Sequence, residues 1–206
     1  MKTVRIGCGA GFAGDRIEPA VELATRGSLD YLVFECLAER TIALAQEARA
    51  KDPSRGFDHG VFVPLYLMYP QAEVPVLMLS MKSGYDPAAH IRLGQALAPL
   101  RDEGVLILGS GLTYHNMRGF GRSESSAPAA AFEEWLNTAI GAPDAALRNA
   151  MLEGWESATG ARLAHPREDH LVPLFVIAGA AGEDAGRRVF ADYAMNVTMA
   201  SYVFGA

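Results

Sequence analysis

Short apolar runs alternate with longer stretches of mixed polarity from the start of this 206-residue chain. Residues 3–8 and 30–35 are largely apolar and of strand length, and each precedes a stretch with helical spacing of its apolar positions, at 15–25 and 37–51. Asp52-Pro53-Ser54-Arg55-Gly56 then ends the second helical stretch, because proline restricts the preceding residue and glycine frees the backbone. The pattern predicts a β-α-β-α opening followed by a linker or crossover.

The same alternation continues over the rest of the chain. Predicted helices cover residues 61–68, 88–100, 132–140 and 147–152, and a further helix starts at Pro166 and carries His170. Pro64 is expected in the first turn of the first of these helices, and Asp86-Pro87 as the N-cap and first residue of the second. Predicted strands cover residues 75–80, 105–108, 189–191 and 197–204. Residues 123–131 are small and polar, which is typical of a surface loop. The alternation predicts an α/β fold, a mixed sheet flanked by helices in a single compact domain, with the last strands closing the sheet.

Length and charge narrow the class of protein. Half of the residues are hydrophobic, which is enough for one sizeable core. The formal net charge of −6 and the lack of a Lys/Arg-rich face exclude a phosphate-backbone footprint, so the expected partner is a small molecule and not a nucleic acid. Cys8 and Cys36 form no CxxC pair and are expected to be reduced, buried thiols.

The chain shows no targeting or membrane pattern. Met1-Lys2-Thr3-Val4-Arg5 leads directly into a strand-like run without the apolar core of a secretory signal. The apolar runs are far shorter than the roughly 20 residues that a membrane-spanning helix needs. Cytoplasmic residence without membrane contact is therefore expected, and the oligomeric state is left open.

Three histidines lie in segments that are typical of a functional site. His115 follows the apolar strand 105–108 in the segment Gly109 to Asn116, and ligands of α/β sheets bind beyond the carboxyl ends of strands. His59 lies in Asp58-His59-Gly60, and His170 closes the segment that begins with His165-Pro166. Three spaced histidines suggest one assembled site.

These segments, together with Tyr69-Pro70, Leu79-Ser80 and Leu100 to Gly104, resemble the class III extradiol ring-cleavage dioxygenases of the 4,5-DOPA type. The resemblance runs from about residue 55 to the C-terminus, and residues 57–206 are expected to be the C-terminal part of an extradiol dioxygenase domain. Residues 1–56 instead resemble the start of acyclic terpene utilisation proteins, through Ile6 to Arg16 and Tyr31 to Thr41. The chain is thus similar to two families joined near residue 56, whether by gene fusion, a misassembled reading frame or designed recombination.

The dioxygenase resemblance implies a non-haem iron(II) site that holds a catechol and dioxygen, with zinc possible in place of iron. It assigns His170 as a metal ligand. It assigns His115 as an acid/base that accepts a catechol proton and returns it, as an imidazole with a near-neutral pKa can do. It assigns His59 to the substrate or oxygen, with Asp58 fixing its tautomer, while a rival role for His59 is capping the following helix.

Two further residues are placed near the substrate. His165 is implied to contribute to the substrate pocket, although Pro166 constrains the backbone after it. Asn116 is expected either to lie at the substrate and orient the loop, or to be a turn residue that holds the backbone. His90 lies on the 88–100 helix outside any motif, so it is expected to be a surface or satisfied core histidine without function.

A glycine-rich turn follows the first strand. Gly9, Gly11 and Gly14 stand between a strand and a helix, where backbone amides can bind an anion. The spacing departs from G-x-G-x-x-G, and no ribose partner other than Glu35 suggests itself, so a tight structural turn is the alternative.

Two motifs of the dioxygenase family are absent from this sequence. The family's Gly-His-Gly-Ser-Pro and Ser-Ala-His-Trp turns each supply an iron-binding histidine, and no histidine precedes His59 here. Weak iron binding and impaired activity are therefore expected, unless Asp15, Glu35 or Asp58 replaces the missing ligands. The competing hypothesis is a non-catalytic fusion or remnant whose glycine loop binds an anion or a partner.

Overall fold

The computed structural model describes residues 4–8, 56–72, 74 and 76–205, with the backbone alone for residues 4–8. Its contacts fall into two compact units. Residues 1–81 and 96–110 form one, here called the sheet unit, and residues 82–95 and 111–206 form the other, the helical unit. Helices and strands alternate through the described part of the chain, which confirms the α/β class.

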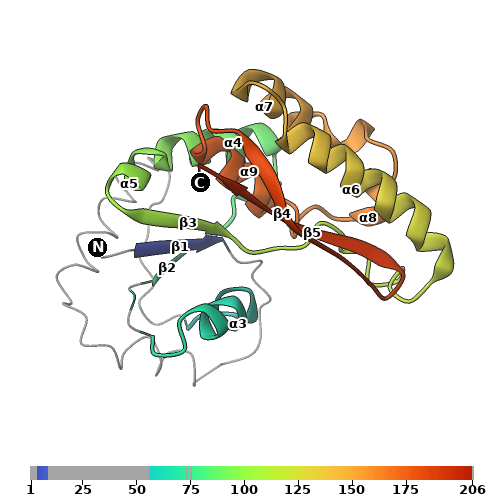
Figure 1. The fold of residues 1–206 in the computed structure, drawn as a ribbon, viewed down its shortest axis with the longest axis horizontal. Coiled ribbons are helices and arrows are strands. Elements are labelled where there is room, and N and C mark those ends of the chain that lie inside the picture. Colours follow the sequence, from blue (N-terminus) through green and yellow to red (C-terminus); the bar gives the residue numbers. More distant parts are fainter. Residues whose placement is uncertain (1–3, 9–55, 73, 75, 206) are drawn as a thin grey trace. The chain divides into compact units, whose positions relative to one another are not determined.

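The sheet unit is built on three parallel strands. β1 (Val4–Cys8) lies between β2 (Val76–Leu79) and β3 (Val105–Gly109), so that Ile6 is paired with Leu77 on one side and Ile107 on the other (Figure 1). The first strand thus pairs on both sides with strands from the later part of the chain. The predicted strand 30–35 and helices 15–25 and 37–51 lie outside the described residues.

Proline positions change two of the predicted helices. α3 (His59–Met68) begins two residues earlier than predicted, which places Pro64 inside the helix instead of in its first turn. The predicted helix 88–100 is divided into α4 (Pro87–Leu97) and α5 (Pro99–Asp102), because Pro99 lacks the N–H group that would continue the first helix. The N-cap is confirmed, since the Asp86 carboxylate accepts the backbone N–H groups of Ala88 and Ala89 at 3.3 and 3.1 Å.

The helical unit contains the remaining helices. They are α6 (Ser126–Ile140), α7 (Ala145–Glu153), α8 (Ala161–Ala164) and α9 (Val172–Ala180), with short 3₁₀ turns at Ser123–Ser125 and Trp155–Ser157. The loop predicted at 123–131 is wrong for its second half, because residues 126–131 form the first turns of α6. Three consecutive alanines, 129–131, favour that helix.

α9 lies in the core of the helical unit, and most of its residues are buried. It crosses α4 at very short range, since a side chain on Gly94 would meet the Val176 carbonyl oxygen at 2.0 Å and one on Gly179 would meet the Ile91 carbonyl oxygen at 2.1 Å. Only glycine fits at both positions, so the two backbones touch directly.

The last two strands form their own sheet. β4 (Gly186–Ala194) and β5 (Val197–Phe204) pair as an antiparallel hairpin that lies along α6 (Figure 1). In the described part of the chain they pair only with each other, so they do not close the parallel sheet as predicted. Met195 and Asn196 both have positive φ, at 51° and 62°, as a two-residue hairpin turn requires. No helix among the described residues is long and apolar enough to cross a membrane.

Candidate metal and acid-base site

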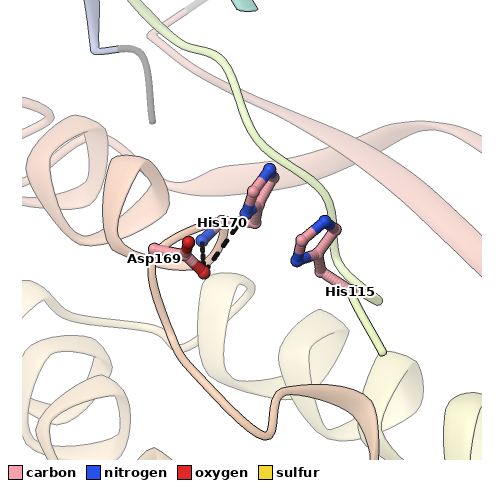
Figure 2. Close-up of side chains that lie close together, drawn as sticks. All are labelled: His115, Asp169 and His170. Atoms are coloured by element: carbon pink, nitrogen blue, oxygen red, sulfur yellow. Dashed lines mark hydrogen bonds and ion pairs between the residues drawn. The ribbon is translucent and has the colours of Figure 1, made fainter. Parts of the chain in front are cut away.

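Two loops of the helical unit bring a group of possible metal ligands together. His115 lies in the loop that follows β3, and Asp169 and His170 lie in the turn that precedes α9. One ligand atom from each of the three side chains lies within 4.8 Å of the others (Figure 2). The predicted helix that starts at Pro166 and carries His170 is wrong. α9 begins only at Val172, with Pro173 in its first turn, so His170 lies in the turn before it.

Asp169 faces His170 closely. Its Oδ1 atom lies 3.2 Å from His170 Nδ1 and accepts the backbone N–H of His170 at 3.1 Å. The angles at Nδ1 do not make a hydrogen bond, so that buried nitrogen has no hydrogen-bond partner among the described residues and its contact with Asp169 is electrostatic. The side chains are 14% and 11% exposed, so solvent reaches both only slightly.

The imidazoles of His115 and His170 are stacked. Their ring centroids are 3.4 Å apart and the ring planes differ by 18° (Figure 2). A histidine binds a metal through a nitrogen lone pair in the plane of its ring, at about 2.0–2.1 Å. Planes this nearly parallel do not meet within that distance of both rings, so the two imidazoles do not share one ion in this arrangement. One ligand beside one acid/base fits the geometry better.

The chemistry of the remaining donors fits a metal. His170 and Asp169 supply an imidazole and a carboxylate, which are the donor types that non-haem iron(II) and zinc prefer. Asp169 was not among the residues singled out in the sequence, although it stands directly before His170. In the sequence only its position next to His170 indicates a role, and an ordinary surface carboxylate can stand at such a position too.

Burial favours the neutral form of His115. Desolvation lowers the pKa of His115 below its ordinary value; nearby His170 lowers it further, and Asp169 partly offsets these effects. The imidazole is therefore neutral near pH 7. A neutral imidazole has a free nitrogen lone pair, which is what a proton acceptor needs.

Hydrogen bonds join the His115 loop to residues 163–170. The backbone N–H of Leu112 donates to the His170 carbonyl at 3.1 Å, and that of His115 donates to the Ala164 carbonyl at 2.9 Å. A side chain on Gly111 would meet the His170 carbonyl oxygen at 2.2 Å, so glycine permits this contact. These contacts fix the position of His115 relative to His170.

Asn116 adds to the same contacts. Its Nδ2 donates to the Leu163 carbonyl at 2.9 Å, and its Oδ1 accepts the backbone N–H of Arg118 at 3.1 Å. Both polar atoms of the amide are bound within the chain, which supports the interpretation as a turn residue. Substrate contact by Asn116 stays a prediction.

The two fully buried histidines have different surroundings. His90 donates from Nδ1 to the Asp86 carbonyl at 2.8 Å and accepts the Lys82 backbone N–H at Nε2 at 3.1 Å, so it is the satisfied core histidine that the sequence predicted. His165 lies behind the His115 loop, and its Nε2 donates to the Thr113 carbonyl at 3.0 Å.

The other predicted site residues are not tested. His59 is the first residue of α3 in the sheet unit and is exposed, and its convergence with His115 and His170 stays a prediction. The glycine loop with Gly9, Gly11 and Gly14 lies outside the described residues.

Comparison with known proteins gives one family. A family model described as the catalytic LigB subunit of aromatic ring-opening dioxygenase matches residues 8–205. This match includes most of the segment for which the sequence suggests another ancestry, and the likeness of that segment to acyclic terpene utilisation proteins stays a prediction.

Curated relatives and a solved structure agree with this family. The chain is 49% identical to a 4,5-DOPA dioxygenase extradiol of Beta vulgaris over 140 residues, which are 65% of this chain and 50% of that protein. It is 39% identical to the dioxygenase tasH of Hapsidospora irregularis over 168 residues, 75% of this chain and 51% of the relative. The crystal structure of the uncharacterised protein JW3007 from Escherichia coli K12 is similar with a TM-score of 0.74 at 26% identity, over 98% of this chain and 84% of the other. The chain spans about half the length of the curated relatives it matches.

Proposed function

Because this chain belongs to the LigB family of aromatic ring-opening dioxygenases, we propose that it binds a catechol of the DOPA type and opens its ring by extradiol cleavage. The observation that carries the proposal is the contact of His115, Asp169 and His170 in two joined loops. The names of the relatives, 4,5-DOPA dioxygenases among them, support the substrate class.

His170 would hold iron(II), or zinc in its place, at this site, with Asp169 beside it. When bound, iron(II) would supply the Lewis acidity that draws in the two catechol oxygens and the redox chemistry of dioxygen, whereas zinc would supply the Lewis acidity alone. Asp169 contributes negative charge beside His170 Nδ1, which strengthens the histidine as a donor through its other ring nitrogen.

His115 is the proton carrier in this proposal. Its imidazole is neutral near pH 7 and is half-buried, so a ring nitrogen can accept the proton of a catechol hydroxyl group and return it after ring opening. The stack on His170 places this acid/base directly beside the ligand. His59 would hydrogen-bond the substrate or oxygen, with Asp58 setting its tautomer.

Activity is expected to be low. The family's two histidine-containing turns are not in this sequence, so His170 keeps only part of the ligand set, and metal affinity depends on the number and geometry of ligands.

Anaerobic reconstitution tests the proposal. The purified chain is loaded with iron(II), given catechol or DOPA with oxygen, and followed by absorbance of the yellow semialdehyde. We expect slow turnover, and weak iron binding that His170→Ala removes and His115→Ala keeps. No turnover in the iron-loaded chain would contradict ring opening and favour the non-catalytic alternative. Fast turnover would defeat the expected impairment, while iron binding that is equal in both variants would show that the ion does not lie at His170.

A further inference from the structure

His165 makes a single long-range hydrogen bond from a completely buried position. Its ring has no exposed surface, and Nε2 lies 3.0 Å from the carbonyl oxygen of Thr113, 52 residues earlier in the chain. A carbonyl oxygen only accepts, so Nε2 carries the proton. A ring without exposed surface offers nothing to a substrate, which argues against the substrate-pocket role that the sequence suggests.

The bonded carbonyl lies in the middle of the loop that carries His115. Leu112, the residue before Thr113, donates to His170, and His115, two residues after Thr113, donates to Ala164. Thr113 is itself buried, and its hydroxyl oxygen accepts the backbone N–H of Ala200 at 3.0 Å. His165 thus satisfies the carbonyl between two backbone bonds that join the loop to residues 164–170.

Aromatic side chains fix the orientation of the His165 ring. Phe132 packs against it edge to face at 5.5 Å and 68°, and Trp155 does so at 6.1 Å and 88°. The ring cannot turn without losing these contacts. Nδ1 has no hydrogen-bond partner among the described residues, so the bond from Nε2 to Thr113 is the one hydrogen bond that the ring makes there.

We propose that His165 is a positioning residue, whose Nε2–H group holds the Thr113 carbonyl and thereby sets the His115 loop against the His170 turn. Its importance for catalysis rests on the proposed function, whereas the hydrogen bond and its effect on the loop do not. Burial lowers the pKa of His165 to about 4, so the neutral, single-tautomer form is the one present near neutral pH.

Replacements of His165 should differ in effect according to where their side chain places a hydrogen-bond donor. Glutamine carries its amide nitrogen at the distance of Nε2 and should keep the bond to Thr113. Asparagine carries its nitrogen at the distance of Nδ1 and should not reach the carbonyl. Phenylalanine keeps the ring volume and removes the donor. Phe and Asn variants should therefore loosen the loop, and His165→Gln should restore it.

Hydrogen exchange and NMR of the full chain without metal or substrate test this. His165→Phe should accelerate exchange of the Leu112 and His115 amides roughly tenfold or more relative to core amides such as that of Leu136, because a buried carbonyl loses its donor. His165→Gln should stay within about threefold of the parent chain. The ring-current shift of the His115 ring protons, which the His170 ring causes, should be lost in the Phe and Asn variants and retained in the Gln variant.

His90→Phe is the matched control, because His90 is equally buried in the same unit and lies outside the site. It should change all core amides together and leave the ring-current shift intact. Unchanged exchange at Leu112 and His115 in His165→Phe, or rescue by Asn instead of Gln, would overturn the proposal.

If His165→Phe does not fold, the ¹⁵N spectrum of the parent chain decides, since a proton on Nδ1 of His165 instead of Nε2 contradicts the proposal. Iron binding at His170 is measured separately, so failure of the proposed function leaves this result standing.

Discussion

The two ends of α9 are held in different ways. At its C-terminal end the guanidinium of Arg148, which is only 1% exposed, donates to three carbonyl oxygens, those of Ala178, Gly182 and Asp184, at 3.0, 2.6 and 2.9 Å. Its Nε atom makes no hydrogen bond among the described residues, but the two terminal nitrogens make three. At the N-terminal end the turn with His170 keeps a ring nitrogen without a hydrogen-bond partner among the described residues, 3.2 Å from the Asp169 carboxylate.

This difference separates stability from chemistry within one helix. A buried cation at the C-terminal end both satisfies the free carbonyls and complements the helix dipole. A turn that retains unsatisfied nitrogen atoms beside a carboxylate costs stability but leaves groups that can bind or transfer a proton. We therefore expect changes at the C-terminal end to affect unfolding, and changes at the N-terminal end to affect binding.

The largest effect is expected at the C-terminal end. Arg148→Met should lower the free energy of unfolding by about 3–5 kcal/mol, because three carbonyl groups lose a buried donor. Urea denaturation measures this. Arg122→Met, at an exposed arginine 3.5 Å from Glu124, is the control and should cost about 1 kcal/mol or less. Equal losses in both variants would show that Arg148 does not hold the end of α9.

The second effect concerns pH. The pKa of His165 falls from its ordinary value of 6.5 to about 4 on folding, so the unfolded chain binds more protons between these values. The contribution of His165 to the free energy of unfolding is therefore fully present above pH 6.5. As the pH falls toward 4, that contribution decreases by about 3 kcal/mol. Unfolding curves at several pH values should show this loss in the parent chain and a smaller one in His165→Gln. Parallel pH profiles for the two proteins would contradict it.

A third prediction concerns Asp169 at the N-terminal end. Asp169→Asn should weaken iron(II) binding roughly tenfold, because a carboxylate beside a metal-binding histidine is replaced by a neutral amide. Calorimetric titration gives the affinity, and Asp192→Asn, at an exposed carboxylate of β4, serves as the control. Affinity that falls equally in both variants would mean that net charge, and not this site, binds the ion.

The smallest effect is expected at Asn116. Asn116→Ala should cost about 1 kcal/mol of unfolding free energy through the lost bond to the Leu163 carbonyl, and leave catechol binding unchanged. Denaturation and ligand titration on the same preparation measure both quantities. Weaker catechol binding with unchanged stability would favour the interpretation that Asn116 contacts the substrate.

Local patterns predicted most of the described elements. The runs 105–108 and 75–80 are short, apolar and bounded by turn residues, so their strands were evident, and Asp86-Pro87 marked the start of α4. The hairpin turn was not evident, because Met195 and Asn196 adopt positive φ without the glycine that usually signals it.

The site was predictable in part. The histidines at 115 and 170 were found from their motifs, and the structure brings them together with Asp169. The position of His165 depends on a bond across 52 residues and on two aromatic neighbours, which no local pattern reveals. The expected helix at His170 was wrong because the first proline of the segment, Pro166, lies in a bend, and the helix begins at Val172 with the second proline, Pro173, in its first turn.

The central place of β1 has a consequence for the synthesis of this chain. Residues 4–8 leave the ribosome before their two partner strands, which are made only when residues 76–79 and 105–109 follow. During that interval both edges of β1 lack the neighbours they have in the folded protein, a state that favours aggregation. Parallel pairing across about a hundred residues also forms slowly, so these three strands are paired only after residue 109 has been made.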